Sequence, residues 1–441
     1  MNRHPEHQYL DILRELRDKL VKHGATANRT AVKAVKVAGR TMRFDLSDGT
    51  IPMLTTKKLH LKSIVAELLW FLSGDTNNET LAKQGVRIWN EWAIPEDENR
   101  LSATEVHDYY VRAMAEAEDI KPSEAEARVK YAEERGLLDD LIEACALTPV
   151  KNRTIHAKGD LGPLYGQQWR RFPAGDFFKS KSMSLDELST YIDAMALDQY
   201  AQLKREASSQ DGRGIDLSIA RDVLGEDIGI DQISQAITLL KTQPNSRRNI
   251  VTAWNPQVVP SDALSPQDNV RRGRAALAAC HTFFQFITEE LTLDERIELV
   301  NKARGYDQEA SLVEALQAAE FARGFFGGMN IPTHRLNCTF FCRSQDTMLG
   351  TPYNVASYAI LTRMVAQVVN MAPGELIWTG GDVHLYKNHL DAANEQLTRE
   401  PYPFPQLLLN PDKTNLFDFQ LADIKLINYH AHDSIKAEVA V

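Results

Sequence analysis

The apolar side chains of the N-terminal part of the chain change their spacing twice. Residues 7–23 place apolar groups three and four positions apart, which predicts an amphipathic helix. Residues 41–56 alternate apolar and polar side chains around an Asp-Gly pair, which predicts two strands joined by a turn. Residues 61–77 are apolar nearly all round and predict a buried helix, with Glu67 in its middle. A carboxylate at such a position invites a functional interpretation.

The C-terminal half alternates strand-like and helix-like segments. Runs of β-branched and aromatic residues predict four more strands, at 249–254, 281–288, 336–342 and 375–382. Helical spacing of apolar residues recurs at 229–241 and 355–369. Helices with one apolar face need a surface to cover, so we expect them to pack on a sheet in an α+β fold.

Three stretches differ in composition and pattern from these predicted strands and helices. Residues 94–158 are rich in Ala and charged side chains, residues 173–228 are polar, and residues 287–334 contain further helical patterns. Loop-closure entropy grows slowly with length, so one stable core tolerates excursions of this size. We therefore expect residues 1–441 to form a single domain with three insertions.

The composition is that of a folded chain without a strong electrostatic field. The 441 residues are 43% hydrophobic and 25% charged, which excludes disorder of the whole chain. The formal net charge of −10 provides no general electrostatic attraction for a nucleic acid or an anionic membrane, so neither is expected as a partner. The sequence shows no apolar run of about 18 residues and no secretory signal, so we expect a cytoplasmic protein without a membrane span.

The cysteines offer two kinds of chemistry. Cys338 and Cys342 have the C-x3-C spacing of one arm of a zinc site, but no second pair follows at ligand spacing, so no metal is expected. Cys280 comes directly before a predicted strand and is followed by His281. It is either a buried strand-start cysteine or a nucleophile whose thiolate needs cationic neighbours. Neighbours on a strand face opposite ways, which argues against a Cys-His hydrolase pair.

Two basic clusters are candidates for binding an anion. Arg247 and Arg248 precede a predicted strand and are either a solvated turn or an anion site. Because adjacent strand residues face opposite sides, one site within the same subunit would use only one of them. Arg343 and Ser344 combine a guanidinium with a hydroxyl, as phosphate sites do.

Polar side chains at element ends offer further recognition chemistry. Asn354 lies just before or at the start of a predicted helix, where it is either an N-cap or a carboxamide that reads an imide edge such as that of uracil. His384 and Tyr386 follow the last predicted strand on one face and suit a sugar hydroxyl.

Taken in order, these segments resemble the thymidylate synthase family. The matching blocks cover most of the chain outside the three excursions and include NRT at 28–30, LTTKKLHLKSIVAELLWFLSGDTN at 54–77, IWNEWA at 88–93, GDLGPLYGQQWR at 159–170, PNSRRNIVTAWNP at 244–256, ACHTFFQF at 279–286, and the run that contains LNCTFFCRSQDTMLGTPYNVASYA. The resemblance implies a mixed sheet flanked by helices, with dUMP as substrate and 5,10-methylenetetrahydrofolate as cosubstrate.

The resemblance also implies roles for individual residues. Cys280 would attack C6 of the pyrimidine, and Glu67 would organise a proton network that reaches Tyr165 and His281. The implied nucleotide-binding residues are Arg29, Arg343 and Ser344 for the phosphate, Asn354 for uracil, His384 and Tyr386 for the deoxyribose, and Arg247 and Arg248 from the partner subunit of a homodimer. The implied folate-binding residues are Lys57, Trp89, Trp92, Asp346, Gly350, Tyr353 and Val441, of which Asp346 also belongs to the catalytic set and Val441 closes the site.

Several positions depart from the usual family pattern. The family generally has a glycine-rich loop after NRT, where this chain reads AVKAVKV, and Ala279, Cys342 and Tyr353 replace a usual Pro, Gln and Phe. Relatives that make 5-hydroxymethyl nucleotides add water in the last step where the synthase adds hydride. Asn354 favours uracil over cytosine, and Trp89, Leu277 and the terminal AEVAV match the drier synthase pocket. We therefore favour methylation over dUMP hydroxymethylation, with a catalytically silent interaction protein as a third hypothesis.

Overall fold

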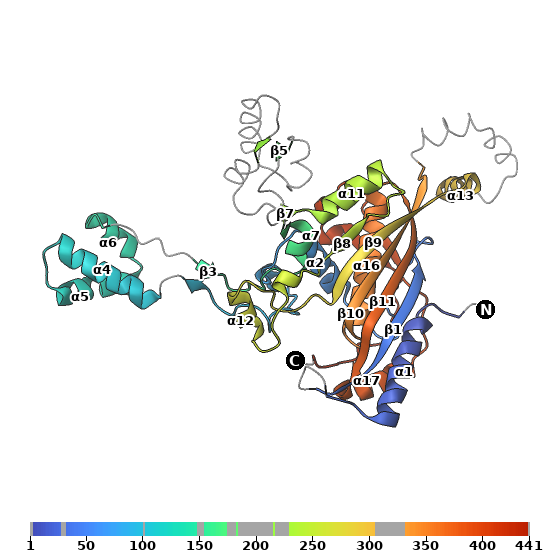
Figure 1. Ribbon diagram of the computed structural model, residues 1–441, viewed down its shortest axis with the longest axis horizontal. Coiled ribbons are helices and arrows are strands. Elements are labelled where there is room, and N and C mark those ends of the chain that lie inside the picture. Colours follow the sequence, from blue (N-terminus) through green and yellow to red (C-terminus); the bar gives the residue numbers. More distant parts are fainter. Residues whose placement is uncertain are drawn as a thin grey trace.

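The computed structural model describes residues 3–27, 32–99, 102–147, 154–173, 182–183, 215–216, 229–304 and 331–439. Its centre is a five-stranded sheet in the order β1-β11-β10-β9-β8 (Figure 1). The strands are β1 (Ala34–Asp45), β8 (Ile250–Thr252), β9 (His281–Glu290), β10 (His334–Asp346) and β11 (Ala372–Tyr386). Strands β10 and β11 are parallel and the other neighbours are antiparallel, so the sheet is mixed. The predicted α+β class is confirmed.

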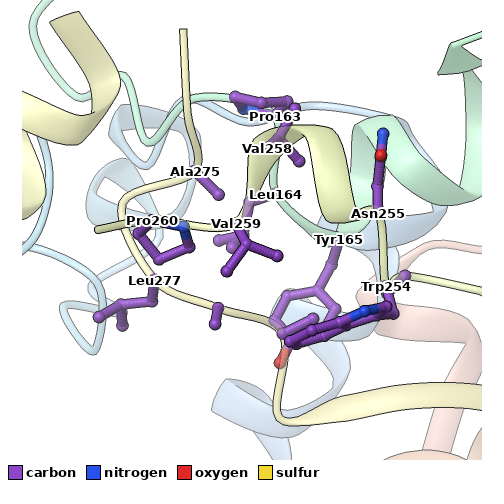
Figure 2. A pocket seen from close by; sticks show the side chains of 13 residues that line it. Pro163, Leu164, Tyr165, Trp254, Asn255, Val258, Val259, Pro260, Ala275 and Leu277 are labelled. Atoms are coloured by element: carbon purple, nitrogen blue, oxygen red, sulfur yellow. The ribbon is translucent and has the colours of Figure 1, made fainter. Parts of the chain in front are cut away.

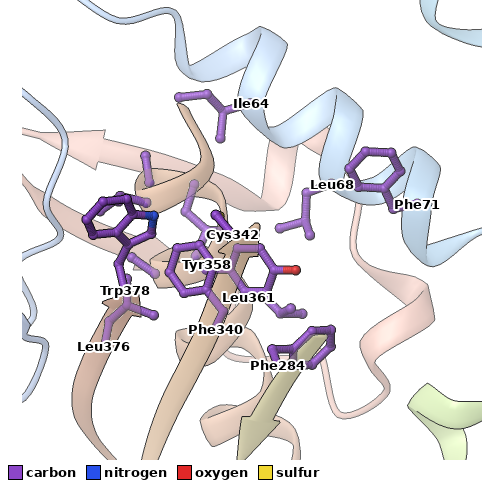
Figure 3. Close-up of a cluster of buried hydrophobic side chains, with 14 of the residues drawn as sticks. Ile64, Leu68, Phe71, Phe284, Phe340, Cys342, Tyr358, Leu361, Leu376 and Trp378 are labelled. Carbon is purple, nitrogen blue, oxygen red and sulfur yellow. The ribbon is translucent and has the colours of Figure 1, made fainter. Parts of the chain in front are cut away.

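Helices α2 (Leu61–Leu72) and α16 (Gly350–Val368) bury most of their side chains beside this sheet. Small and apolar residues nearly all round α16 allow it to lie against β10 and β11. Figure 3 shows the resulting core, in which Tyr358 of α16 stacks on Phe340 of β10 with ring centroids 4.1 Å apart. Trp378 of β11 and Phe284 of β9 are fully buried in the same cluster. The sheet face that meets α16 is therefore the main core.

The amphipathic helix predicted for residues 7–23 is confirmed as α1 (His7–His23), which packs on β1. The remaining elements around the core are α3 (Glu79–Lys83), α7 (Tyr165–Arg170), α11 (Gln232–Thr242), α12 (Pro266–Arg271), α17 (Leu390–Gln396), β12 (Gln406–Leu409), β13 (Ile424–Ile427) and short 3-10 turns at 256–258, 387–389, 416–418 and 421–423.

The strand pair predicted for residues 41–56 is wrong in its second half. The first run is part of β1. Strand β11 pairs with β1 along its whole length, so the second run does not pair with the first. After Gly49, which has φ of 94°, the chain turns inward and residues 51–57 are buried. Thr55 and Thr56 there donate hydrogen bonds to the buried carboxylate of Glu6 rather than to a strand. The apolar run is thus a core segment without strand pairing.

The first insertion is helical and has its own hydrophobic cluster. Helices α4 (Ala103–Ala117), α5 (Pro122–Arg135) and α6 (Leu138–Ala144) pack around Tyr110, Met114 and Val129. The two-stranded pair of β2 (Glu98–Asn99) and β3 (Thr154–His156) connects them to the rest of the chain. In Figure 1 these helices stand apart from the sheet. The single-domain organisation stays a prediction.

The other two insertions also leave and return through paired strands. Strands β4 (Phe172–Pro173) and β7 (Gly229–Ile230) are antiparallel neighbours, and the second insertion between them includes the pair β5 (Ser182–Met183) and β6 (Ile215–Asp216). The third insertion connects β9 to β10, where Glu290 lies opposite His334, and begins with α13 (Leu293–Arg304). Most of 173–228 and residues 305–330 lie outside the described residues. Within the described part of the chain, no helix has the length and apolar character needed to cross a membrane.

Candidate active site

Cys280 is held in place by groups from two other elements. The backbone N–H of Cys280 donates to the hydroxyl of Tyr165, the first residue of α7, over 2.6 Å. Arg343 of β10 donates from its backbone to the Cys280 carbonyl over 2.8 Å. The guanidinium of Arg343 donates to the carbonyls of Ala279 (2.8 Å) and Ala278 (2.9 Å). The Arg343 guanidinium thus lies beside the loop that carries Cys280, which is partly exposed.

The wall beside this loop is largely apolar. Figure 2 shows Tyr165, Trp254 and Leu277 around the pocket that Ala278 and Ala279 also line. The guanidinium carbon of Arg343 lies 5.4 Å from the centroid of the Trp254 ring. Such a wall limits the access of water to one side of the nucleophile loop.

Glu67 is the buried carboxyl that the helical pattern of residues 61–77 marks as unusual. The indole N–H of Trp89 donates to Glu67 Oε1 over 2.9 Å. Part of the residue remains exposed, but protein atoms enclose the carboxyl group, and this burial raises the pKa of Glu67 to about 7. Near neutral pH the group can therefore both donate and accept a proton.

His281 and Tyr165 form a stacked pair next to Cys280. Their ring centroids are 4.0 Å apart with planes inclined by 9°. Burial lowers the pKa of His281 to about 3 and raises the pKa of Tyr165 well above 10, so both groups are neutral at physiological pH. His281 Nδ1 lies 2.9 Å from the hydroxyl of Tyr358, which fixes the imidazole ring.

Asn354 faces the same narrow pocket as Glu67 and His281. It is the fifth residue of α16, whose N-cap is Leu349, so the N-cap interpretation of Asn354 is wrong. The helix begins earlier than its apolar pattern indicates. Asn354 Nδ2 donates to Gln345 Oε1 over 3.4 Å, which orients the carboxamide. One donor and the Oδ1 acceptor remain for a ligand.

The residues expected near the folate lie around the β10–α16 connection and the segment before it. Asp346 Oδ1 accepts from the backbone N–H groups of Met348 (2.8 Å) and Leu349 (3.2 Å). Gly350 starts α16, and a Cβ there would lie 2.6 Å from Gln345 Nε2, so a larger residue would displace the Gln345 side chain. Lys57 is 3% exposed and donates to the carbonyl of Met348, and burial lowers its pKa to about 8.

The aromatic residues of that group are partly exposed. Trp89 and Trp92 meet edge to face with centroids 5.7 Å apart. Tyr353, on α16, packs against the main core, and burial raises the pKa of its hydroxyl. These three rings are flat surfaces that a planar ligand can contact.

The residues expected to bind the sugar and phosphate lie at the carboxyl ends of two parallel strands. Ser344 and Asp382 are paired in register, as are Asp346 and His384. His384 Nδ1 lies 3.1 Å from Asp382 Oδ1, which leaves Nε2 for another partner. Tyr386 meets His384 edge to face at 5.0 Å. The register of β10 and β11 therefore brings these polar groups to one edge.

Arg247 and Arg248 do not join this group within one chain. Both are exposed in the turn before β8, and the Arg247 carbonyl accepts from Gln285, five residues after Cys280 on β9. That offset is about 16 Å along a strand. Arg29 and Val441 lie outside the described residues.

Three residues with contacts at the site were not predicted. Tyr358 comes four residues after Asn354, and the helical period could have placed it on the same face of α16. Gln345 is 1% exposed, and no pattern predicts its bond to Asn354. His389 Nε2 lies 2.7 Å from the carbonyl of Glu438 and so ties the C-terminal segment to the end of β11.

The described residues include no group of three or more His, Cys, Asp or Glu that could hold a metal ion. Cys338 and Cys342, the pair with zinc-like spacing, are both buried in β10. Burial raises the pKa of Cys338 to about 12 and the pKa of Cys342 well above its usual range. Both thiols are therefore protonated core groups.

Comparison with known proteins identifies the family. The family model described as thymidylate synthase matches residues 7–441. A thymidylate synthase of Francisella philomiragia subsp. philomiragia is 32% identical over 434 residues, which cover 98% of this chain and 99% of the relative. The family uses methylenetetrahydrofolate as its cosubstrate. With a match over nearly the whole length and a fold that agrees, the chain belongs to the thymidylate synthase family.

Proposed function

We propose that this protein converts dUMP and 5,10-methylenetetrahydrofolate into dTMP and dihydrofolate, with Cys280 as the nucleophile. The observation that carries the proposal is that Cys280, partly exposed and held by Tyr165, directly precedes His281, which lines one pocket together with Glu67 and Asn354. The proposed nucleophile directly precedes β9, and the proposed proton carrier and pyrimidine-reading amide come from α2 and α16.

The proposed reaction begins when the thiolate of Cys280 adds to C6 of uracil. The electron pair of the C5–C6 double bond moves toward O4, and C5 becomes nucleophilic. Asn354 donates its second Nδ2 hydrogen to O4 and accepts the N3–H of the ring at Oδ1. The one-carbon unit of the folate would exchange its two carbon–nitrogen bonds for a bond to C5 and a bond to the hydride that the folate also supplies, which leaves dihydrofolate. Departure of the thiolate then restores the C5–C6 double bond.

Glu67 is the proposed proton carrier of this sequence. The proton of C5 must leave after the new carbon bond forms, and a carboxyl group with a pKa of about 7 can accept and return protons at neutral pH. His281, with a pKa of about 3, stays neutral and acts by position. The bond from Trp89 keeps Glu67 oriented toward the pocket.

The described residues fit a folate. The partly exposed indoles of Trp89 and Trp92 provide flat faces for its rings, and Asp346 uses Oδ1 for the backbone, so that we assign Oδ2 to a pterin N–H. Lys57 would reach the glutamate tail only after leaving the carbonyl of Met348.

We further propose that the protein is a homodimer formed through the sheet face opposite α16. That face carries Phe283 (39% exposed), Ile287 (41%) and Ile250 (48%). Such a cluster of exposed apolar side chains on a sheet favours a partner surface. Arg247 and Arg248, exposed at its edge, would then reach the partner's phosphate site beside Arg343 and Ser344.

Product analysis tests the proposed reaction. Incubation with dUMP and methylenetetrahydrofolate should give dTMP by mass and the absorbance of dihydrofolate. Formation of 5-hydroxymethyl-dUMP with tetrahydrofolate would replace the proposal by the hydroxymethylase, in which water takes the place of hydride. Cys280→Ser should abolish turnover, whereas Cys145→Ser, in the helical insertion, should retain it. Turnover that survives in the Cys280 variant contradicts the assigned nucleophile.

A further inference from the structure

The helical insertion contains a groove that the proposed reaction does not use. It lies between α5 and α6, has a volume of about 590 Å³, and includes Met114 of α4. The apolar residues that line it include Met114, Ala127, Tyr131, Leu137, Leu141 and Ala144. Because these helices have their own hydrophobic cluster around Tyr110 and Val129, the groove is a surface of a packed unit and no gap in the main core.

The groove exposes side chains that a protein normally covers. Tyr131 is 53% exposed and Leu137 is 42% exposed. Ala127 and Ala144 are exposed small residues on the two helices, which leave room for side chains of an occupant. Single exposed apolar residues are ordinary, but here they gather in one concave site. An apolar stripe from another segment would bury them.

The charge around the groove indicates what that segment carries. Residues 102–147 hold 12 acidic and five basic side chains, a net charge of −7 within a chain of −10. Glu124 and Asp140 line the groove itself, and Arg128, which also lines it, already bonds Glu124 at 2.7 Å. A second copy of this acidic insertion, a nucleic acid or an anionic membrane would be repelled. A basic occupant is attracted.

We propose that the groove between α5 and α6 binds a basic amphipathic helix of a partner protein. An apolar stripe would enter between Tyr131 and Leu137, and lysine or arginine side chains flanking it would meet the surrounding acids. The proposal does not depend on the reaction at Cys280. In Figure 1 the insertion lies away from the sheet, so the occupant would leave the active site open.

Binding to the full chain can be measured with a fluorescein-labelled helical peptide of about 18 residues, with leucine on one face and lysine on the other. A peptide in which glutamate replaces lysine is the matched control. We expect saturable binding of the lysine peptide alone. Ala127→Trp fills the groove and should weaken binding about tenfold or more, whereas Ser123→Trp, exposed on the same helix outside the groove, should not.

Two neighbouring aspartates distinguish binding in the groove from attraction to the overall negative charge of the insertion. Asp140 lines the groove and Asp139 does not, although both are exposed on α6. Asp140→Asn should weaken binding more than Asp139→Asn. Absence of binding, or equal effects within both pairs of variants, would overturn the proposal. Unchanged far-UV circular dichroism of the tryptophan variants shows that the helices of the insertion remain folded, and Ala144→Trp repeats the test from the other wall.

Discussion

Replacing Glu67 by Gln tests whether this carboxyl carries protons near neutral pH. In the parent protein the Trp89 indole N–H donates to Glu67 Oε1 over 2.9 Å. Glutamine keeps the shape of the side chain and this oxygen acceptor, but it cannot ionise. We expect kcat/KM for dUMP to fall by a factor of about 10² to 10⁴, as for loss of a general acid–base group. The inflection of the pH profile near pH 7 should disappear with it.

The same substitution has a predictable effect on stability. Burial raises the pKa of Glu67 from 4.5 to about 7, so folding disfavours the ionised form by roughly 3 kcal/mol. Because the folded-state pKa lies above the unfolded one, this cost is absent well below pH 4.5, grows between pH 4.5 and 7, and is complete above pH 7. Glu67→Gln removes it. The variant should exceed the parent by about 3 kcal/mol at pH 8 and by about 1 kcal/mol at pH 5.

Urea unfolding followed by tryptophan fluorescence at both pH values measures this difference. Glu126→Gln, at an exposed position of α5, is the control and should change stability equally at pH 5 and pH 8. A pH-independent effect of Glu67→Gln would show that the folded protein does not penalise the ionised carboxylate. An inflection that persists near pH 7 in the variant would assign the titrating group to another residue.

Three further outcomes follow from the geometry. Asn354→Asp exchanges an amide donor for an acceptor, so the ratio of kcat/KM for dCMP to that for dUMP should rise by about a hundredfold, and an unchanged ratio in competition assays contradicts pyrimidine reading by this residue. Arg343→Ala should raise KM for dUMP about tenfold or more through lost charge-assisted bonds, whereas an unaltered KM removes Arg343 from the phosphate site. Replacing residues 100–153 by Asn-Gly, which joins the paired ends of β2 and β3, should leave turnover within about twofold; a loss of activity would show that the insertion supports the site.

Local pattern predicted the elements whose burial follows a regular period. The helix of residues 7–23 shows one apolar stripe along its length, and α1 buries that stripe on β1. The segment 51–56 carries a similarly clear apolar signal, but its neighbours in space come from Glu6 and from the chain near Tyr402. An apolar run states that a segment is buried and does not state which backbone lies beside it.

The sequence predicts which residues belong to the candidate site, but it does not predict the contacts between them. The order and sequence of the matching blocks indicated Cys280, Glu67 and Asn354. Each of these residues matches a family pattern, or is polar in a segment that is otherwise apolar. The bonds from Trp89 to Glu67 and from Asn354 to Gln345 join segments whose approach depends on the assembled sheet and helices. Hydrogen-bond partners of this kind leave no period in the sequence.

The paired ends of the three insertions have a consequence for distances along the chain. One insertion separates Trp89 from Tyr165, the next separates Tyr165 from Cys280, and the third separates Cys280 from Arg343. Each begins and ends at neighbouring strand residues, so its length is uncoupled from the spacing of the side chains it separates. The positions of the candidate site residues in space therefore depend on their order along the chain, whereas the number of residues between them is free to vary.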